Sequence, residues 1–256
     1  MPNPAGDYPG RQIFLGLLKS GEPAFAYFGS GRSPGSQQRY ATKFIPQESS
    51  VRIRPLDPNE PFDPFRHYQA IRIDPKTGLA VVSNSQSPVD PVFEAFMFMT
   101  ENEKKTGAFL ARLLKVIGPE YDNPKNPEKA TSRIVGVAFP TEIGFVDVLG
   151  ITTKPKVAAE RTFDIVEGEL RWISTYDGNI DYSNYNMERL SDDRNILQTS
   201  ARTAQELADE IYEMSDYIDP KYGELRVWTV AGVRNGNGPG GWEIARRNRH
   251  VPPAEA

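Results

Sequence analysis

The chain lacks the residues on which several common chemistries depend. It contains no cysteine, which excludes disulfides, zinc–thiolate sites and a cysteine nucleophile. Only two histidines are present, His67 and His250, and there is no H-E-x-x-H motif. A Ser-His-Asp triad or a histidine-rich metal site would have to use one or both of them. We therefore expect neither triad chemistry nor metal-dependent hydrolysis.

Long apolar runs and an excess of positive charge are also missing. No segment approaches the ~18 apolar residues of a membrane helix, and residues 1–12 lack the apolar centre of a signal peptide. These absences predict a cytoplasmic protein without membrane contact. The formal net charge is -4, whereas a protein that coats nucleic acid is basic. We therefore expect no nucleic-acid partner, although one small basic pocket is compatible with this charge.

What is present is the composition of an ordinary globular protein. Hydrophobic residues make up 38% of the 256 residues, and 22 Pro with 21 Gly indicate many turns. No internal repeat is evident, and no linker forces a division of the chain. We predict a single domain over residues 1–256, with a core at about 10–248 and short tails at 1–9 and 249–256.

Strand patterns dominate the sequence. Residues 12–18 and 23–28 flank the turn "KSGE" and predict a hairpin. Apolar and polar residues alternate at 51–56 and 68–74, which is typical of half-buried strands. Further strands are predicted at 79–84, 133–139, 144–152, 161–168, 169–176, 226–233 and 241–248. The three tryptophans fall in such patterns, so we interpret Trp172, Trp228 and Trp242 as core or interface residues.

Helix patterns are fewer. Residues 89–99 form the first, with Asp90 as a natural N-cap and Pro91 at the first helical position. Residues 103–118 form a second, amphipathic helix. The third, 203–218, opens with the capping-box pair Thr203 and Glu206. Its predicted apolar stripe is Leu207, Ile211, Met214 and Ile218. Clustered helices and hairpin-linked strands predict an α+β protein with largely antiparallel sheets.

The stretch "FGSGRSPGSQQRYA", residues 28–41, contains the first candidate site residues, Arg32 and Arg39. It matches neither the P-loop nor the G-x-G-x-x-G pattern, and a polar, Pro-containing segment follows it instead of a helix. Glycines let the backbone approach a ligand, and arginines offer planar donors that match phosphate. Two interpretations remain open for this stretch alone, a solvated turn and an anion site.

Three other segments contain candidates. "VVSNSQSPVDP", residues 81–91, places Ser83, Asn84 and Asp90 where a buried strand meets a helix, so they could read a polar ligand or only cap the helix. On the strand 68–74, alternation puts Tyr68 and Arg72 on one face about 13 Å apart, at ~3.3 Å per residue, so they could line one cleft. Arg133 begins a strand directly after a polar loop, a common position for ligand-binding residues.

The order of these motifs resembles the archaeal-type inosine-monophosphate cyclohydrolases and their bacterial relatives. The series is "GRQIFLGLLKSGEPAFAYFGSGRSPGSQQR", "YQAIRID", "VVSNSQSPVDP", "ATSRIVGVAF", "RTFDIVEGELRWISTYDG" and "GWEIARRN", and it runs from Gly10 to about Asn248. The chain departs from the family at "GSGRSPGSQQR", "SNSQSPVD" and "TSRI", and its loop before Thr131 is longer. The positions that match the family motifs are Arg32, Arg39, Tyr68, Asn84, Asp90 and Arg133.

This resemblance implies a four-layer αββα fold of the N-terminal-nucleophile hydrolase type. No Ser, Thr or Cys opens the first strand, "GRQIFLGLL", so self-processing to expose a nucleophile is not supported. The implied reaction is the ring closure of a formamido-imidazole-carboxamide ribotide to inosine monophosphate with loss of water. The implied partner is therefore a purine nucleotide substrate. No metal or redox cofactor is required, and a homo-oligomer is allowed but not demanded.

The resemblance also implies roles for individual residues. Arg32 would contact the phosphate or the developing oxyanion, and Tyr68 would donate a hydrogen bond to the formyl oxygen or pass a proton. The further substrate contacts would come from Arg39, Arg72, Ser83, Asn84, Asp90 and Arg133. Glu94, Glu120 and Glu128 all remain candidates for the proton acceptor. Two alternatives stay open, a diverged enzyme for another phosphorylated or amide-bearing molecule and a non-catalytic nucleotide-binding protein.

Overall fold

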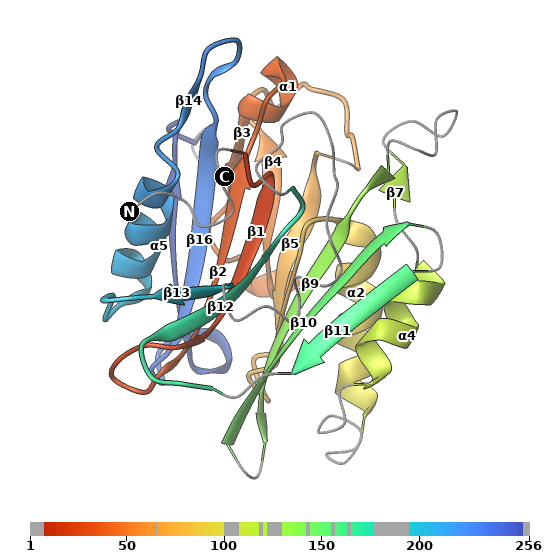
Figure 1. Ribbon diagram of the computed structural model, residues 1–256, viewed down its shortest axis with the longest axis vertical. Coiled ribbons are helices and arrows are strands. Elements are labelled where there is room, and N and C mark those ends of the chain that lie inside the picture. The colour runs from red at the N-terminus through yellow and green to blue at the C-terminus, as the bar shows by residue number, and fades with distance from the viewer. Residues whose placement is uncertain are drawn as a thin grey trace.

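Two antiparallel sheets form the framework of the protein (Figure 1). The computed structural model describes residues 8–64, 66–99, 108–117, 120–121, 130–141, 144–154, 157–162, 165–176 and 195–252. Within these residues the chain is α+β, with few helices and with antiparallel pairing throughout both sheets. The predicted fold class is therefore confirmed at this level.

The first sheet contains both ends of the described chain. Its strand order is β13-β12-β1-β2-β16-β17. The bounds are β1 (Arg11–Leu17), β2 (Pro23–Ser30), β12 (Glu169–Ser174), β13 (Ile196–Gln198), β16 (Arg226–Arg234) and β17 (Trp242–Asn248). The predicted hairpins at 12–28 and 226–248 are confirmed by the pairs β1–β2 and β16–β17.

The second sheet is built from the middle of the sequence. Its strand order is β11-β10-β9-β6-β5-β4-β3. The bounds are β3 (Arg39–Ala41), β4 (Ser50–Pro55), β5 (Tyr68–Ile73), β6 (Ala80–Ser83), β9 (Arg133–Thr141), β10 (Gly144–Lys154) and β11 (Val157–Thr162). Two small hairpins stand apart, β7 (Glu120–Tyr121) with β8 (Ala130–Thr131) and β14 (Ile218–Asp219) with β15 (Gly223–Glu224).

A shared apolar core joins the two sheets. Because side chains alternate along a strand, Ile13, Leu15 and Tyr27 pack in one cluster with Ile71 and Ile134 of the other sheet. The sheets approach closely at Gly136 in β9, where a Cβ would lie 2.7 Å from a methyl carbon of Ile13. All three tryptophans are buried, and Trp228 and Trp242 belong to this shared core, as the strand patterns predicted.

The helices cover the outer faces of the two sheets (Figure 1). Helix α5 (Ala204–Met214) packs Leu207 and Ile211 against Phe14 and other residues of the first sheet. Helices α2 (Gln86–Phe98) and α4 (Ala108–Ile117) cover Val135 and Val137 of the second sheet. The short elements are α1 (Pro34–Gln37), η1 (Pro46–Glu48) and η4 (Pro239–Gly241).

Two predicted helix boundaries are wrong. Helix α2 begins at Gln86, with Ser85 as an extended N-cap residue, and Pro91 lies inside the helix. Proline is tolerated in a first helical turn, where Pro88 falls, so the helix can start earlier than Asp90. Helix α5 has Thr203 as its N-cap, as predicted, but it ends at Met214. Ile218 lies in β14 and is 68% exposed, so it does not extend the apolar stripe.

Two further predictions need adjustment. The strand predicted at 161–168 is β11, which begins at Val157 and ends at Thr162, while Glu167 makes only an isolated bridge with Leu17. The segment after Arg32 contains α1, a helix of four residues that Ser33 caps, where no helix was predicted. A capping box between Ser33 and Ser36 stabilises this single turn.

Candidate active site

Most of the predicted site residues lie at one end of the sheets. In the second sheet, Arg39 begins β3, Tyr68 begins β5, Arg133 begins β9, and Ser83 ends β6. Neighbouring strands run antiparallel, so the start of one strand lies beside the end of the next. The register therefore gathers residues that are far apart in the sequence. The sequence motifs themselves are separated by long stretches of chain.

Two buried tyrosines meet between the sheets. The hydroxyl oxygens of Tyr27, from β2, and Tyr68, from β5, lie 2.5 Å apart. Arg11, the first residue of β1, donates from Nε to the Tyr68 hydroxyl at 3.4 Å. Its Nη1 donates to the carbonyl oxygens of Gly10 and Ser30, which fix the guanidinium at the sheet end. Tyr68 thus receives a charged donor in the apolar space between the sheets.

Arg39 is fully buried in the same region. Its Nε donates to the Ser36 carbonyl at 2.9 Å, and its Nη1 donates to the Arg66 carbonyl at 3.2 Å. The guanidiniums of Arg11 and Arg39 both lie over the ring of Trp228, at 4.8 and 4.9 Å from its centroid. Within the described residues, the Arg39 Nη2 atom has no hydrogen-bond partner. The Arg39 Nη2 group is therefore available to donate a hydrogen bond to a ligand.

We call Arg11, Tyr27, Arg39, Tyr68 and Arg133 the arginine–tyrosine cluster. Burial lowers the pKa of Arg39 to about 9, the nearby charge of Arg11 adds to this, and the facing tyrosines oppose it. Burial likewise lowers the pKa of Arg133 to about 9, again against the effect of Tyr68 and Tyr27. For Arg11 the tyrosines outweigh burial, and its pKa is raised. All three side chains remain cationic at neutral pH.

The charge of this cluster suits an anionic ligand. In the part of the chain that the structure describes, the side chains of Arg11 and Arg39 contact only carbonyl oxygens, a hydroxyl and an aromatic ring, and no carboxylate. Burying a cation without a counter-charge is costly. A bound anion would remove that cost. For Arg39, the interpretation of residues 28–41 as a solvated turn is therefore wrong, because its side chain is inaccessible to solvent.

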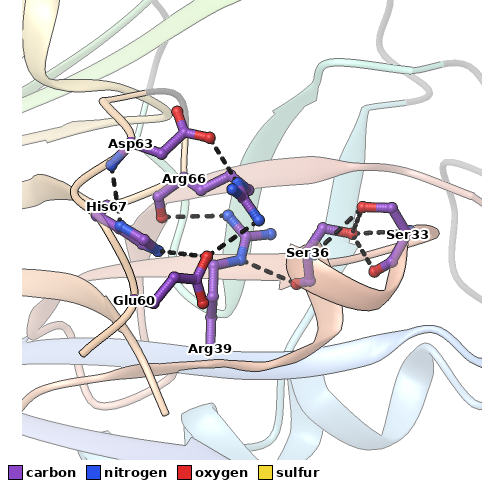
Figure 2. A network of polar contacts seen from close by, with 7 residues as sticks. All are labelled: Ser33, Ser36, Arg39, Glu60, Asp63, Arg66 and His67. Carbon is purple, nitrogen blue, oxygen red and sulfur yellow. Dashed lines mark hydrogen bonds and ion pairs between the residues drawn. The ribbon is translucent and has the colours of Figure 1, made fainter. Parts of the chain in front are cut away.

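A network of polar contacts orients Arg39 (Figure 2). The two carbonyls that hold its guanidinium belong to α1 and to the turn that ends at His67. Arg66 stabilises this turn through ion pairs with Asp63 at 2.6 Å and Glu60 at 3.1 Å. Its guanidinium also lies against Gly35 of α1, where a Cβ would come within 2.0 Å of Nη1. Arg66 thus connects the two segments that hold Arg39.

His67 belongs to this network and not to a catalytic triad. Its Nδ1 accepts a hydrogen bond from the Asp63 backbone N–H at 3.1 Å, and its Nε2 lies 3.6 Å from a carboxylate oxygen of Glu60 (Figure 2). Burial lowers the pKa of His67, and the opposing effect of Glu60 is smaller. The imidazole is therefore neutral at neutral pH and supports the turn around Asp63.

Arg32 lies outside the arginine–tyrosine cluster, in a group of aromatic residues. Its guanidinium is 5.7 Å from the ring centroid of Tyr8 and 5.4 Å from that of Tyr176, and its Nη2 donates to the Tyr176 hydroxyl at 3.4 Å. The phenol of Tyr8 also contributes to the pKa of both Arg11 and Arg39. Arg32 is only partly buried, which places it near the solvent side of the site.

Asn84 and Ser83 are occupied by the backbone around Arg133. Asn84 donates from Nδ2 to the Ser132 carbonyl at 2.7 Å and accepts at Oδ1 from the Ile134 N–H at 3.0 Å. Ser83 donates to the Ile134 carbonyl at 3.1 Å. Both side chains are buried. They hold the first residues of β9, although the sequence suggested direct ligand contacts or helix capping.

The prediction that Tyr68 and Arg72 share a face is wrong. The register between β4 and β5 shifts so that Ala70 is an extra residue, a β-bulge, between them. The bulge breaks the alternation, and Tyr68 faces the other sheet while Arg72 lies under helix α2. There Arg72 pairs with Asp90 at 2.9 Å and covers the Phe93 ring. Arg72 and Asp90 therefore form an ion pair outside the arginine–tyrosine cluster.

Of the three predicted carboxylates, the structure describes the side chain of Glu94 alone. Glu94 is exposed on α2. Glu120 is placed only by its backbone, in the small hairpin of β7 and β8. Glu128 lies outside the described residues. The choice of a proton acceptor among them stays a prediction. A separate surface cavity of about 620 Å³, lined by Ser200, Ala201, Arg202, Glu206, Asp209 and Glu210, contains none of the predicted site residues.

The sequence analysis did not identify Arg11 or Tyr27. It also did not identify Tyr8 and Tyr176, the two tyrosines that contact Arg32. Arg11 follows a glycine at the start of a strand, and Tyr27 is one aromatic residue within an apolar run. Neither position stands out by residue type. A search for polar side chains on a strand face that must lie between two sheets would have found Tyr27.

The fold and the site together define a class of protein. It is an α+β protein with two antiparallel sheets and a group of arginines and tyrosines, of which Tyr27, Arg39, Tyr68 and Arg133 are buried. A family model described as IMP cyclohydrolase-like protein matches residues 8–223. The chain belongs to this family, and the match includes every residue of the arginine–tyrosine cluster. No curated protein matches the chain. Within the described residues, no helix is both long and apolar enough to cross a membrane.

Proposed function

We propose that the protein is an IMP cyclohydrolase of purine biosynthesis, and that its fold is the four-layer αββα arrangement of the N-terminal-nucleophile hydrolase type. The substrate would be a formamido-imidazole-carboxamide ribotide, and the products would be inosine monophosphate and one water. The observation that carries this proposal is the arginine–tyrosine cluster, which has cationic donors and, among the described residues, no carboxylate on Arg11 or Arg39. Family membership supports the same reaction.

The reaction needs little beyond positioning and charge stabilisation. The carboxamide nitrogen attacks the formyl carbon of the same molecule, a C–N bond forms, and negative charge develops on the formyl oxygen. One proton moves from that nitrogen to the oxygen. The hydroxyl then leaves with the formamido N–H proton as water, and a C=N bond completes the ring. Because both reacting groups belong to one substrate, holding the reactive conformer supplies much of the acceleration.

The cluster offers groups for each of these tasks. Tyr68 would donate its hydroxyl proton as a hydrogen bond to the formyl oxygen, since that oxygen gains charge in the transition state. Arg39 and Arg133 would bind the anionic parts of the substrate with their buried guanidiniums. Arg32, on the solvent side, would contact the phosphate. Asn84 and Ser83 would act through the backbone around Arg133.

One observation would also fit a different function. The loop with Arg32 and Arg39 departs from the family sequence at "GSGRSPGSQQR", although both arginines are retained. A changed loop with unchanged cations would suit a diverged enzyme for another phosphorylated or amide-bearing molecule, or a protein that only binds nucleotides. Incubation of the purified protein with the formylated ribotide, followed by absorbance of inosine monophosphate, separates these functions. Turnover supports the cyclohydrolase, and nucleotide binding without turnover supports the binding protein.

A further inference from the structure

We propose that Tyr27 is a positioning residue that directs the hydroxyl proton of Tyr68 toward the substrate. This inference rests on the proposed function, because it assigns a partner to the group that would contact the reacting oxygen. Tyr27 lies in the predicted strand 23–28, and neither its residue type nor its spacing predicts a role in the site. It comes from the other sheet and contacts Tyr68 only because the two sheets pack face to face.

The hydrogen-bond inventory of the two hydroxyls supports this assignment. A phenol has one O–H donor and can accept from its oxygen. Tyr68 accepts from Arg11 Nε, and its remaining contact is with Tyr27 at 2.5 Å. Among the described residues, Tyr27 has no other hydrogen-bond partner than Tyr68. If Tyr68 donated to Tyr27, the Tyr27 proton would be left without an acceptor deep in the core, which is unfavourable.

The opposite arrangement leaves no such defect at Tyr27. Tyr27 donates to Tyr68, whose oxygen then accepts two hydrogen bonds, one from Tyr27 and one from Arg11. Burial raises the pKa of Tyr27 well above its ordinary value, so Tyr27 keeps its proton. The Tyr68 proton must then point away from both neighbours. Tyr68 is the first residue of β5, at the sheet end that Arg39 and Arg133 also occupy.

This arrangement also makes Tyr68 a better donor. Hydrogen bonds in a chain polarise one another, and a hydroxyl that accepts from a guanidinium and from a second hydroxyl donates more strongly. A buried chain of this kind is preorganised, because neither tyrosine has to reorient when charge develops on the substrate. Tyr27 therefore acts on the reaction through Tyr68 and need not contact the substrate.

The first experiment compares ring-closure kinetics in Tyr27→Phe, Tyr68→Phe and the double variant. Tyr212→Phe is the matched control, because Tyr212 is a buried tyrosine in α5. We expect Tyr27→Phe to lower kcat about tenfold or more, a smaller loss than removal of a direct oxyanion donor, and to change KM much less. The double variant should be no slower than Tyr68→Phe alone. A wild-type kcat in Tyr27→Phe, or losses that multiply in the double variant, would overturn the inference.

The second experiment needs no substrate. Carbon-13 labelling at Cζ of tyrosine reports the environment of each phenol oxygen by NMR. The Tyr68 signal, assigned from its absence in Tyr68→Phe, should shift in Tyr27→Phe and stay in place in Tyr212→Phe. An unmoved Tyr68 signal contradicts the hydrogen bond on which the inference rests. If the wild-type protein closes no ring, the proposed function fails, while the NMR shift still decides whether Tyr27 orients Tyr68.

Discussion

Asn84 holds the backbone on both sides of Arg133. One atom of its side-chain amide donates to the carbonyl before Arg133, at 2.7 Å, and the other accepts from the N–H after it, at 3.0 Å. Only an amide offers a donor and an acceptor at this reach. The direction of the buried Arg133 side chain therefore depends on a residue of the neighbouring strand end. This relationship makes Asn84 a residue that positions the backbone around Arg133.

The first prediction concerns this relationship. Asn84→Asp removes the donor to the Ser132 carbonyl and adds a buried charge, so we expect a loss of about 1–3 kcal/mol in the free energy of unfolding. The affinity for an anionic substrate should fall as well, because Arg133 is no longer held. Denaturant unfolding and KM measure the two effects. Asn237→Asp, at an exposed loop position with the same change of charge, should leave both unchanged. Equal effects of the two substitutions would contradict the assignment.

The second prediction concerns Arg39. Arg39→Ala should abolish most of the thermal stabilisation that inosine monophosphate gives to the folded protein, because this stabilisation decreases as the Kd rises. For the wild type, ligand at 100 times its Kd is expected to add about 2.7 kcal/mol. Arg54→Ala, which removes an exposed arginine of β4, should keep the full shift in Tm. Similar shifts in Tm for the two variants would show that inosine monophosphate does not bind at Arg39.

The third prediction concerns pH and His67. Its folded-state pKa is lowered by burial, so the unfolded chain binds more protons below its ordinary pKa of 6.5. The stability from the neutral imidazole is therefore present above that pH and is lost as pH falls through the folded pKa. Asp63 and Glu60 face the ring, with Arg66 and Arg39 nearby, and their charges modify the effect without reversing it.

The measurement is Tm as a function of pH between about 7 and 5. The wild type should lose stability with a steeper slope than His67→Asn, whose amide can still accept from the Asp63 N–H but cannot gain a proton. A wild-type slope in His67→Asn would show that another group governs this range.

The fourth prediction concerns the contact between Gly35 and Arg66. Gly35→Ala places a methyl group within 2.0 Å of Arg66 Nη1, and the flexible guanidinium can move away at little cost in stability. The move loosens the turn whose carbonyl holds Arg39, so KM should rise severalfold while Tm changes little. Arg66→Ala should have the same effect on KM, and the double variant should add nothing further. Independent, multiplying effects of the two substitutions would contradict this connection.

Much of the framework could be predicted from the sequence, because strand alternation and turn residues are local signals. The hairpins 12–28 and 226–248 and the capped start of α5 follow directly from such signals. The bulge at Ala70 has no local signature, and it moved Arg72 to the other face of the sheet. A local pattern shows where apolar and polar residues alternate along one strand. A bulge such as that at Ala70 depends on how the strand pairs with its neighbour, which the pattern does not show.

The sequence predicted several site residues at strand ends, but it did not predict those whose role depends on contacts between the two sheets. Arg39 belongs to a glycine- and serine-rich stretch, Tyr68 to an alternating strand pattern, and Arg133 follows a polar loop, so a local pattern indicates each of them. Tyr27 and Arg11 gain their importance from contacts across the two sheets, and no spacing in the sequence records such contacts. Asn84 was identified by its neighbourhood, yet its partners are backbone atoms that only the fold brings near.

The most direct test of the central claim is the ring-closure rate of the purified wild-type protein beside Tyr68→Phe. The formylated ribotide is added, and inosine monophosphate is followed by its absorbance. We predict that the wild type forms inosine monophosphate well above the uncatalysed rate, and that Tyr68→Phe lowers kcat by about 100-fold or more, as expected when one preorganised donor to a developing oxyanion is lost. Absence of product with the wild type, or an unchanged kcat in Tyr68→Phe, would contradict the account.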